Sequence, residues 1–351
     1  MGALKKEEDD GMAETVVGLM GLGRIGRNLV RILHHRDDIR VGAISDPADH
    51  AGLEYLLRYD TILGRFPASV SLRDGNLYVA GRQIRMLSAE NPGEVQWGEL
   101  GVDVVIEATG KHRSRQELER HLQAGAKRVI LCAPPLDPPD ITVVMGVNDD
   151  RLRPEHRIVS NASVTAHAAA PILKILHRAF GVQRAFLSAI HAYTNQLRLA
   201  DVPAEDMRTG RAAAENIIPQ PSHVAGMLME LMPELGGRID GMALNVPVPN
   251  GSVVDLVCWH ERPVSIAAIN EVMRTAAGSG EWDGIIAYED GPIVSADTKL
   301  SRYSGTFDSL ATMVIGDRLS KTLCWYDNGW GYAHRALDLI HRFAELERRA
   351  A

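Results

Sequence analysis

Residues 15–46 read TVVGLMGLGRIGRNLVRILHHRDDIRVGAISD, and this stretch decides the fold. Its first five residues are mostly apolar and β-branched, which predicts a buried strand. The motif Gly-Leu-Gly-Arg-Ile-Gly follows from Gly21 to Gly26, and apolar residues then recur at the spacing of a helix. A second apolar run, 41–44, predicts another strand that leads to Asp46, 20 residues after Gly26.

A strand, a GxGxxG turn, a helix and a strand ending in an acid form the arrangement that binds dinucleotides. Gly21 permits the turn, Gly23 lets the backbone approach the pyrophosphate, and Gly26 packs the helix on the strand. The helix N-terminus receives the phosphate charge. Asp46 would bind the adenosine ribose and repel a 2′-phosphate, so we expect NAD rather than NADP. A tight turn without a cofactor is the alternative interpretation.

Strands and helices continue to alternate up to residue 162, which predicts a doubly wound parallel sheet. The further elements expected there are strands at 102–108, 129–131 and 142–146 and a helix at 115–124. Ser114 and Glu117 have the spacing of a capping box for that helix. Residues 59–87 instead alternate in short pieces with Asp74-Gly75 as a hairpin turn, which predicts an antiparallel insertion.

The pattern changes after about residue 161. Ser163 is expected to cap a long helix, and strand-like runs with few crossovers follow, which predicts an antiparallel or mixed sheet. These predicted elements are a helix at 164–179, strands at 184–192, 239–247, 252–260, 311–315 and 322–326, and a last helix at 332–349. The expected fold is an α/β Rossmann NAD-binding domain plus an α+β catalytic-type domain. The expected division is a disordered tail at 1–13, the Rossmann domain at 14–162 completed by the C-terminal helix 329–351, and the catalytic-type domain at 163–328.

The composition is that of a globular protein. Of 351 residues, 45% are hydrophobic and 24% are charged, which excludes a disordered or fibrous chain. The net charge of −7 gives no reason to expect nucleic acid or an anionic membrane as a partner. No signal peptide is expected, and the three cysteines, Cys132, Cys258 and Cys324, lack metal-ligand spacing. We therefore expect a cytoplasmic protein with reduced thiols.

Several ordered motifs resemble those of the glyceraldehyde-3-phosphate dehydrogenase family. In chain order they are GLGRIGR, EATG, VMGVN, SNAS-T, the segment 191–195 (HAYTN), RAAAENIIP, NVPVPNGSVVDL and WYDNGWGYAHR. The resemblance runs from Val16 to the last helix, and it implies a Rossmann domain, a catalytic domain of similar size and a homotetramer.

On the cofactor side, the resemblance matches residue by residue. It implies that Asn328 holds the carboxamide of NAD, that Tyr332 lies near the nicotinamide, and that Cys132 occupies a small polar position beside the cleft. The cofactor-binding residues expected are Gly21, Gly23, Arg24, Ile25, Gly26, Asp46, Thr109, Gly110, Cys132, Asn328 and Tyr332.

The catalytic side departs from the family. In the family, a cysteine at a helix N-terminus attacks the aldehyde and a histidine takes a proton as hydride leaves. Here the motif Ser-Cys-Thr reads Ser163-Val164-Thr165, and valine cannot form a thioester. His191 matches the general base. Thioester oxidation of glyceraldehyde 3-phosphate is therefore not expected by the family's route.

The phosphate sites of the family are also altered. Thr209 and Asn245 stand where arginines are expected, and their loss removes bidentate, charge-assisted phosphate contacts. Arg208 and Arg211 are near in sequence and would compensate in part. The substrate-pocket residues that the resemblance implies are Ser163, Thr165, His167, Thr194, Ser222, His223 and Asn245.

Three functions remain open. The first is NAD-dependent oxidation of an unphosphorylated alcohol or aldehyde hydrate with His191 as base, and the second is an inactive NAD-binding pseudoenzyme that acts as a sensor or partner subunit. In the third, His167, His191 and His223 converge on a divalent metal that polarises a carbonyl, although their spacing gives no support for this. His191 as a purely structural residue is a further alternative.

Overall fold

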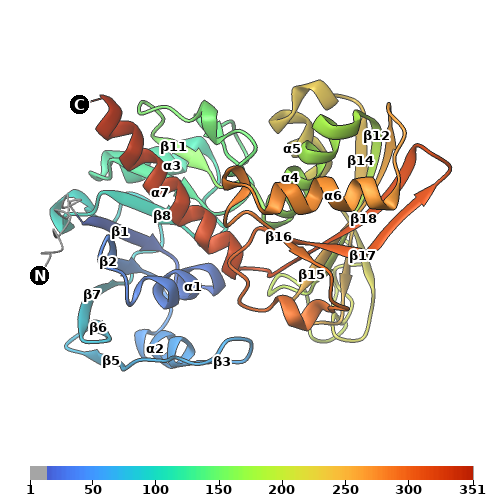
Figure 1. The fold of residues 1–351 in the computed structure, drawn as a ribbon. Coiled ribbons are helices and arrows are strands. Elements are labelled where there is room, and N and C mark those ends of the chain that lie inside the picture. The colour runs from blue at the N-terminus through green and yellow to red at the C-terminus, as the bar shows by residue number, and fades with distance from the viewer. Residues whose placement is uncertain (1–13, 351) are drawn as a thin grey trace, which may run out of the picture.

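The computed structural model describes residues 14–350, and the tail expected at 1–13 lies outside them. Two large sheets lie side by side, and the last helix starts where the two domains meet and runs along the first (Figure 1). The helices are α1 (Arg24–Leu33), α2 (His50–Arg58), α3 (Arg115–Gln123), α4 (Val164–Phe180), α5 (Val224–Leu231), α6 (Ile266–Ala277) and α7 (Trp330–Ala350). The expected α/β Rossmann domain and α+β domain are both present.

The first sheet is the expected parallel one. In spatial order its strands are β10 (Ile141–Thr142), β11 (Ile158–Ser160), β9 (Arg128–Leu131), β8 (Val104–Glu107), β1 (Thr15–Met20), β2 (Ile39–Ser45), β7 (Arg82–Leu87), β6 (Asn76–Val79) and β5 (Val70–Arg73). The chain leaves β1 toward β2 and later returns to β8 on the other side of β1. Between β1 and β8 the strand order reverses, and such a switch point at the carboxyl ends of the strands is where open α/β sheets bind ligands.

The insertion between residues 59 and 87 is partly antiparallel, as predicted. β5 pairs with β6 and β6 with β7 in antiparallel fashion, whereas β7 lies parallel to β2. The turn residues Asp74 and Gly75 both have positive φ, 50° and 72°, as a tight hairpin requires. A separate short hairpin joins β3 (Tyr59–Asp60) and β4 (Gly64–Arg65).

The second sheet is mixed rather than antiparallel throughout. Its order is β13 (Ile218–Pro221), β14 (Ile239–Val246), β12 (Val182–Ala192), β15 (Ser252–His260), β18 (Leu319–Tyr326), β17 (Gly305–Ile315) and β16 (Ile286–Glu289). The pairs β12–β14 and β16–β17 are parallel, because α5 and the segment after β16 carry the chain back across the sheet. Helices α4, α5 and α6 pack on one face and enclose the larger hydrophobic core.

Two details of the sequence-based prediction are wrong. The strand expected at 142–146 ends at Thr142, because the buried Asn148 accepts the Val144 N–H at 2.9 Å and diverts the backbone into a turn. The helices α2, α5 and α6 were not predicted. In α2, only Leu53 and Leu57 are buried, so its apolar periodicity is too short to recognise.

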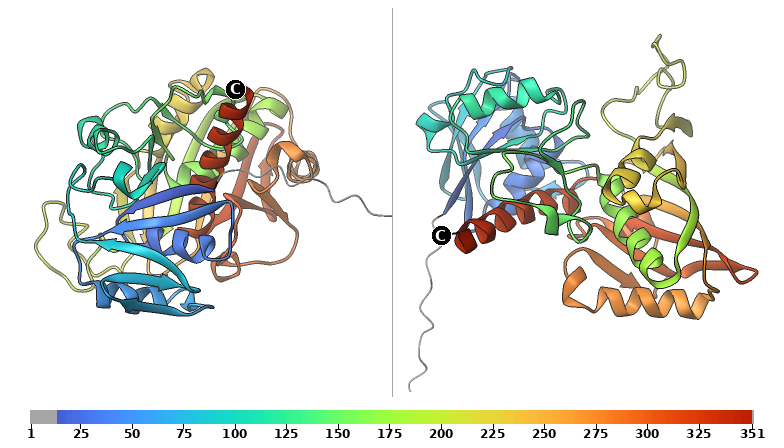
Figure 2. Two further views of the ribbon diagram at one scale, coloured as in Figure 1. Left: turned by 90° about the vertical axis from the view of Figure 1, so that its left-hand side faces the viewer. Right: turned by 90° about the horizontal axis from the view of Figure 1, so that it is seen from above.

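Helix α7 carries the chain from the second sheet back to the first. It runs as the long red helix of Figures 1 and 2, and its residues Ala336, Leu339 and Phe343 belong to the core of the first domain. His341 Nε2 lies 2.8 Å from Asp38 Oδ2, and Arg36 donates to both oxygens of the same carboxylate. The last helix is therefore tied to the start of β2 by a charged cluster.

This cluster makes stability depend on pH. Hydrogen bonds from Arg36 and then His341 hold the pKa of Asp38 well below its usual value of 3.8. A depressed carboxyl pKa contributes stability that is present above the unfolded-state pKa and lost as the pH falls through the folded-state pKa. We expect Asp38→Asn to lower the free energy of unfolding by about 1 kcal/mol at neutral pH, and this difference to shrink as the pH is lowered below about 4.

Urea denaturation of parent and variant at several pH values measures this effect. The control is Asp37→Asn: Asp37 is 91% exposed, and we expect its ion pair with Arg82 to contribute almost nothing. A deficit for Asp38→Asn that stayed constant down to pH 3 would show that its charge is not the source.

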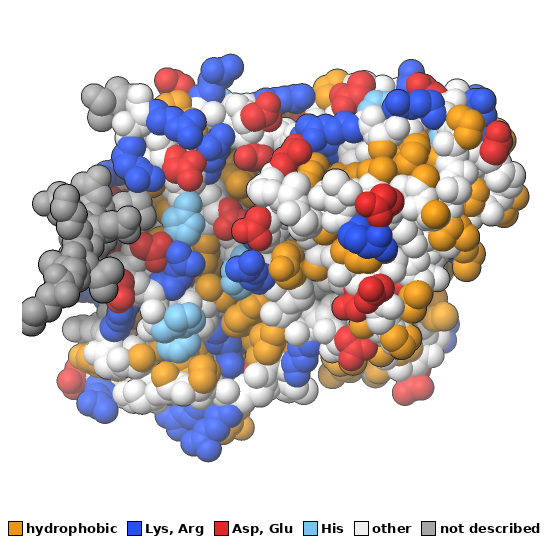
Figure 3. All heavy atoms as spheres, viewed as in Figure 1, with side chains coloured by type: hydrophobic (Ala, Val, Ile, Leu, Met, Phe, Trp, Pro, Cys, Tyr) orange, Lys and Arg blue, Asp and Glu red, His pale blue; other side chains and the backbone are white. Residues whose placement is uncertain are grey.

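The surface carries both signs of charge. Acidic and basic side chains lie next to one another over the face shown in Figure 3. Within residues 14–350, no helix is both long enough and apolar enough to span a bilayer.

Candidate functional site

The glycine-rich turn after β1 is shaped to admit a ligand. Gly21 has φ +96°, and a Cβ on Gly26 would lie 2.3 Å from the Gly21 carbonyl oxygen, so neither tolerates a side chain. A Cβ on Gly23 would meet no described atom within 4 Å, and no described side chain caps the N-terminus of α1 at this residue. Free N–H groups next to open space fit the pyrophosphate of a dinucleotide.

Asp46 lies beside this turn, as its place after β2 predicts. Its Oδ2 accepts the backbone N–H of Leu22 at 2.8 Å, and its Oδ1 accepts that of Ala48 at 3.0 Å. The carboxylate is thereby fixed next to the glycine turn, and its remaining lone pairs can accept ribose hydroxyls.

The other predicted cofactor residues surround the same strand ends. Thr109 follows β8, and its backbone N lies 3.0 Å from the Cβ position of Gly21. Arg24 and Ile25 form the first turn of α1 and are partly buried, and Gly110 has φ +70°. Cys132 follows β9, and burial and the nearby Glu107 charge raise the pKa of its thiol.

His191 lies at the end of β12 on the face covered by the helices. It shares the direction of the buried residues Leu187 and Ala189, since alternate residues of a strand face the same side. In the parallel pair β12–β14 it is level with Asn245, and Asn245 is level with Ile218 of β13. The base candidate and the residue that replaces a family arginine are therefore neighbours on one face.

The hydrogen bonds of His191 define its free nitrogen. Nδ1 lies 2.6 Å from the carbonyl oxygen of Ala192, which can only accept, so Nδ1 carries the hydrogen and Nε2 the lone pair. Burial lowers the pKa of His191, and the charge of Arg24 lowers it further, against the effect of the Ala192 hydrogen bond. The ring is thus neutral at pH 7, with a basic Nε2.

Asn328 is held against this histidine by residues that the sequence analysis did not single out. Its Oδ1 accepts the Gly251 N–H at 2.9 Å, and its Nδ2 donates to Ser252 Oγ at 2.7 Å, which fixes the direction of the amide. The same Nδ2 lies 3.4 Å from each ring nitrogen of His191. The second hydrogen of this NH₂ group is therefore directed to Nε2, the ring nitrogen with the lone pair, over a long contact.

Ser252 connects this amide to the rest of the site. Its hydroxyl also accepts the N–H of Ala192 at 3.0 Å, and Ser252 is level with Tyr326 in the pair β15–β18. The Tyr326 hydroxyl lies 3.0 Å from Thr165 Oγ1, and its ring is 6.1 Å from that of His191. Both residues lie within motifs that served to identify the family, NVPVPNGSVVDL and WYDNGWGYAHR, but only their contacts show what they do.

Asp327 caps the N-terminus of the adjacent helix α7. Its Oδ1 accepts the N–H groups of Gly329 and Trp330 at the start of α7, and its Oδ2 accepts Asn250 Nδ2 at 2.8 Å. Asn250 Oδ1 in turn accepts the N–H of Asn328 at 3.1 Å. The loop before β15 and the start of α7 are therefore joined directly behind the Asn328 amide.

Val164 is the first residue of α4. Ser163 caps this helix, since its Oγ accepts the Ala166 N–H at 3.1 Å, as predicted. Val164 is partly buried and packs against the hydrophobic cores of both domains. The position matched to the family nucleophile is therefore an apolar side chain at the junction of the two domains.

The predicted pocket hydroxyls are occupied by contacts within the chain. Thr165 is bound to Tyr326, Thr194 Oγ1 accepts the Gln196 N–H at 3.4 Å, and Ser222 Oγ accepts the Val224 N–H at 3.3 Å. Asn245 is 7% exposed.

The structure does not bring the three histidines together, so the metal hypothesis is wrong for the described residues. His167 is 1% exposed beneath Tyr332 and Asn161, with Nε2 at 3.0 Å from the Asn161 carbonyl, and burial lowers its pKa to about 3. The prediction that His167 lines the substrate pocket is therefore wrong, because its buried side chain cannot contact a substrate. His223 is exposed at the start of α5, and no group of three potential ligands forms within the described chain.

Tyr332 is buried as well, and its hydroxyl donates to the Ala162 carbonyl at 3.2 Å. The three cysteines are all free and buried. Burial raises the pKa of each thiol, that of Cys258 to about 12. These thiols are therefore poor nucleophiles.

Comparison with known proteins shows which family has this sequence. Residues 15–115 match the family model described as glyceraldehyde 3-phosphate dehydrogenase, NAD binding domain, and residues 163–328 match its C-terminal domain. The chain is 45% identical to glyceraldehyde-3-phosphate dehydrogenase of Geobacillus stearothermophilus over 324 residues, 92% of this chain and 96% of the relative. It is also 45% identical to that of Streptomyces coelicolor, over 92% of this chain and 96% of the relative, and 41% identical to glyceraldehyde-3-phosphate dehydrogenase 1 of Bacillus subtilis, over 94% and 98%.

Proposed function

Because the chain belongs to the glyceraldehyde-3-phosphate dehydrogenase family, with NAD as its cofactor, we propose that it is an oxidoreductase that works without a covalent thioester. Val164 stands where the resemblance places the nucleophilic cysteine, and the three thiols of the chain are buried. The substrate is then an alcohol or an aldehyde hydrate, whose carbon already bears the hydroxyl that is to be oxidised.

The observation that carries this proposal is the tautomer of His191, with the hydrogen on Nδ1 and the lone pair on Nε2. A neutral imidazole with a fixed Nδ1–H presents Nε2 as a general base. Bound NAD supplies the hydride acceptor. His191 Nε2 takes the proton of the substrate hydroxyl while the carbon loses its hydrogen as hydride, and the C–O bond becomes a carbonyl.

Cofactor orientation is assigned to the residues already placed. Gly21, Gly23 and Gly26 would admit the pyrophosphate, and Asp46 the ribose. The Asn328 amide, fixed by its two hydrogen bonds, would hold the carboxamide next to His191. A protein that only binds NAD has no need to present one face of the ring in this way.

The proposed substrate is small and unphosphorylated. Thr209 is hydrogen-bonded to the Asp206 carbonyl, and Arg211 pairs with Asp201 at 3.0 Å. Arg211 therefore does not replace the missing arginine in this structure. Asn245, level with His191, offers a neutral amide in place of a guanidinium.

The test is a screen of alcohols, aldehydes and hydroxy acids with NAD, followed at the absorbance of NADH. We expect at least one unphosphorylated compound to be oxidised and glyceraldehyde 3-phosphate with phosphate not to be. NADH formed from glyceraldehyde 3-phosphate and phosphate, and abolished in His191→Ala, would contradict the proposal.

A pseudoenzyme is the second candidate. It is favoured by the pocket hydroxyls, since Thr165, Thr194 and Ser222 already have hydrogen-bond partners within the chain. A protein of this kind would bind NAD with a dissociation constant below the millimolar range and oxidise nothing in the screen. It would then act as an NAD sensor or as a subunit of another assembly.

Ser252 tests whether the Asn328 amide positions the cofactor for the proposed reaction. Ser252→Ala removes the acceptor of both Asn328 Nδ2 and the Ala192 N–H, which leaves two buried donors unpaired. In an active dehydrogenase we expect kcat to fall about tenfold to a hundredfold with NAD affinity nearly unchanged. Steady-state kinetics and calorimetry measure the two effects, and Ser279→Ala, whose hydroxyl donates to the Ala276 carbonyl of its own turn, is the matched control.

We propose a homotetramer in the cytoplasm. The support is the exposed apolar face of the second sheet, opposite α4 to α6, and the 193–216 segment, which extends from the body in the right panel of Figure 2. Exposed apolar residues there are Phe186, Leu199, Met207, Met242, Trp259, Met313 and Ile315. Free thiols suit a reducing compartment. We also propose that 14–162 with 329–351, and 163–328, are the two domains, since each range contains one of the two large sheets.

A further inference from the structure

A buried carboxylate lies directly under the cofactor turn. Glu107 is the last residue of β8, level with Met20 at the end of β1, and its side chain is fully buried. One carboxylate oxygen, Oε1, accepts both the backbone N–H of Thr109, at 2.8 Å, and the hydroxyl of Thr109. A buried charge persists only when donors surround it, so this carboxylate and the Thr109 turn hold each other in place.

The second oxygen of Glu107 is bound to a histidine whose tautomer is determined. His121 of α3 is fully buried and lies with Nε2 3.3 Å from Glu107 Oε2. The indole N–H of Trp97 donates to His121 Nδ1 at 3.0 Å. Because the indole can only donate, Nδ1 must be bare and the hydrogen must sit on Nε2, where it points to the carboxylate.

Trp97 joins this chain of contacts to β1. Its ring lies against Gly18, where a Cβ would meet the indole at 2.6 Å. At the other end, Thr109 lies 3.0 Å from the Cβ position of Gly21, the first glycine of the cofactor turn. The chain Trp97–His121–Glu107–Thr109 therefore begins and ends on the same strand and its glycine turn.

We propose that Trp97, His121 and Glu107 are positioning residues that act through Thr109 to hold the glycine turn in its NAD-binding shape. This inference concerns the affinity for NAD and does not depend on the reaction proposed above. Its physical basis is the fixed direction of the hydrogen bonds. Trp97 donates to His121, and His121 and Thr109 both donate to the Glu107 carboxylate, which only accepts. None of the three residues faces the cofactor.

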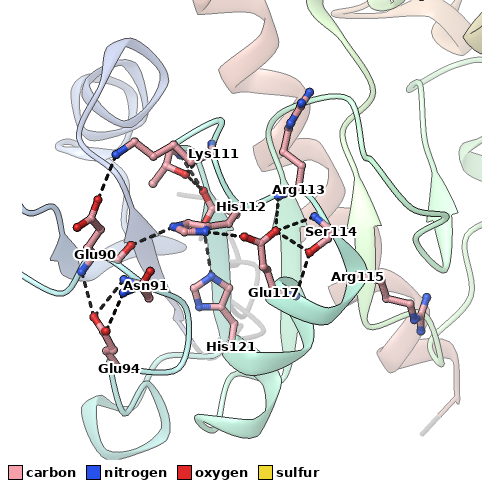
Figure 4. Close-up of polar contacts among 12 residues, drawn as sticks. Glu90, Asn91, Glu94, Lys111, His112, Arg113, Ser114, Arg115, Glu117 and His121 are labelled. Carbon is pink, nitrogen blue, oxygen red and sulfur yellow. Dashed lines mark hydrogen bonds and ion pairs between the residues drawn. The ribbon is translucent and has the colours of Figure 1, made fainter.

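Helix α3 supplies an internal control, because it is anchored at two places. Glu117 and His121 project from this helix in Figure 4. Glu117 closes the capping box with Ser114 and lies 3.1 Å from His112 Nδ1, so this first anchor does not involve Thr109. Changing Ser114 therefore weakens α3 without touching the Glu107 carboxylate.

The principal variant is Glu107→Gln, which keeps the shape but replaces one acceptor oxygen by an NH₂ group. In either orientation that group faces a donor, Thr109 or His121. His121 cannot relieve the conflict by changing tautomer, since Trp97 occupies Nδ1 with a hydrogen. We expect the dissociation constant for NAD, measured by calorimetry on the folded protein, to rise at least tenfold.

Ser114→Ala is the matched control. We expect it to lower the melting temperature through loss of the N-cap and to leave the NAD dissociation constant within twofold of the parent. If Glu107→Gln likewise lowered only the melting temperature and left NAD affinity unchanged, the three residues would be structural and the proposal would be wrong.

Two further variants test the route of the effect. Thr109→Val removes the hydroxyl donor. If Glu107 acts through Thr109, the variant that carries both Thr109→Val and Glu107→Gln should raise the dissociation constant for NAD by less than the product of the two single increases. Adding Trp97→Phe to Glu107→Gln removes the donor at Nδ1 of His121. The hydrogen of the ring can then move to Nδ1, and Nε2 can accept a hydrogen bond from the new NH₂ group. We expect NAD affinity to recover in part although the melting temperature falls further. Multiplicative losses, or no recovery, would overturn the proposed relay.

Discussion

Replacing His191 by alanine is expected to reduce NADH formation from the substrate found in the screen by about 10²- to 10⁴-fold. The variant loses the only group proposed to take the hydroxyl proton. NAD affinity should change less than about threefold, because the Asn328 amide keeps its bonds to Gly251 and Ser252. Steady-state kinetics and calorimetry give the two values.

The pH profile of the parent enzyme tests the same residue. A base must be unprotonated to act, and burial lowers the pKa of His191. Oxidation should therefore rise with pH through a pKa below that of free imidazole and be level above neutrality. An unchanged rate in His191→Ala, or a rise centred above pH 7, would assign the base to another group.

Val164→Cys is expected to produce the largest change in chemical reactivity of any single substitution in this chain. The new thiol would stand at the first position of the 17-residue helix α4, and a helix N-terminus lowers a thiol pKa. We expect iodoacetamide to label it on the order of 10³-fold faster than any native cysteine. The native thiols are buried, and burial raises their pKa.

Mass spectrometry of the labelled protein identifies the modified residue. Labelling of the parent protein under the same conditions should be negligible, and Val164→Ala controls for loosening of the domain junction. Labelling of Val164→Cys at the rate of an ordinary exposed thiol would mean that the start of α4 no longer activates a nucleophile. Labelling of Cys132 in the parent would mean that this thiol is accessible to solution.

Much of the fold is legible in the sequence because its signals are local. The glycine motif, the caps at Ser114 and Ser163 and the turn at Asp74-Gly75 each act within a few residues, and all four are found in the structure. Prediction failed where a side-chain hydrogen bond overruled the apolar pattern or where the pattern was too short. The buried Asn148 ended the strand expected at 142–146 in this way.

The candidate site likewise has one part built from residues close together in the sequence and one part built from residues far apart. The glycine turn and Asp46 meet as expected because Gly21, Gly26 and Asp46 lie on one continuous βαβ segment. The other side could not, because its hydrogen bonds join residues far apart in the chain: Asn328 meets Ser252 across 76 positions and His191 across 137. Periodicity carries no information about such pairs.

The sequence by itself determined that this protein has a dinucleotide-binding domain, that NAD is preferred, and that the residue directly after Ser163 is a valine and not a cysteine. Those conclusions rest on residue type and spacing, which need no third dimension. Only the tertiary structure decided which nitrogen of His191 is basic, that His167 and His223 lie apart from it, and that Glu107 is held by His121. Each of these depends on which donors and acceptors meet after distant strands and helices pack together.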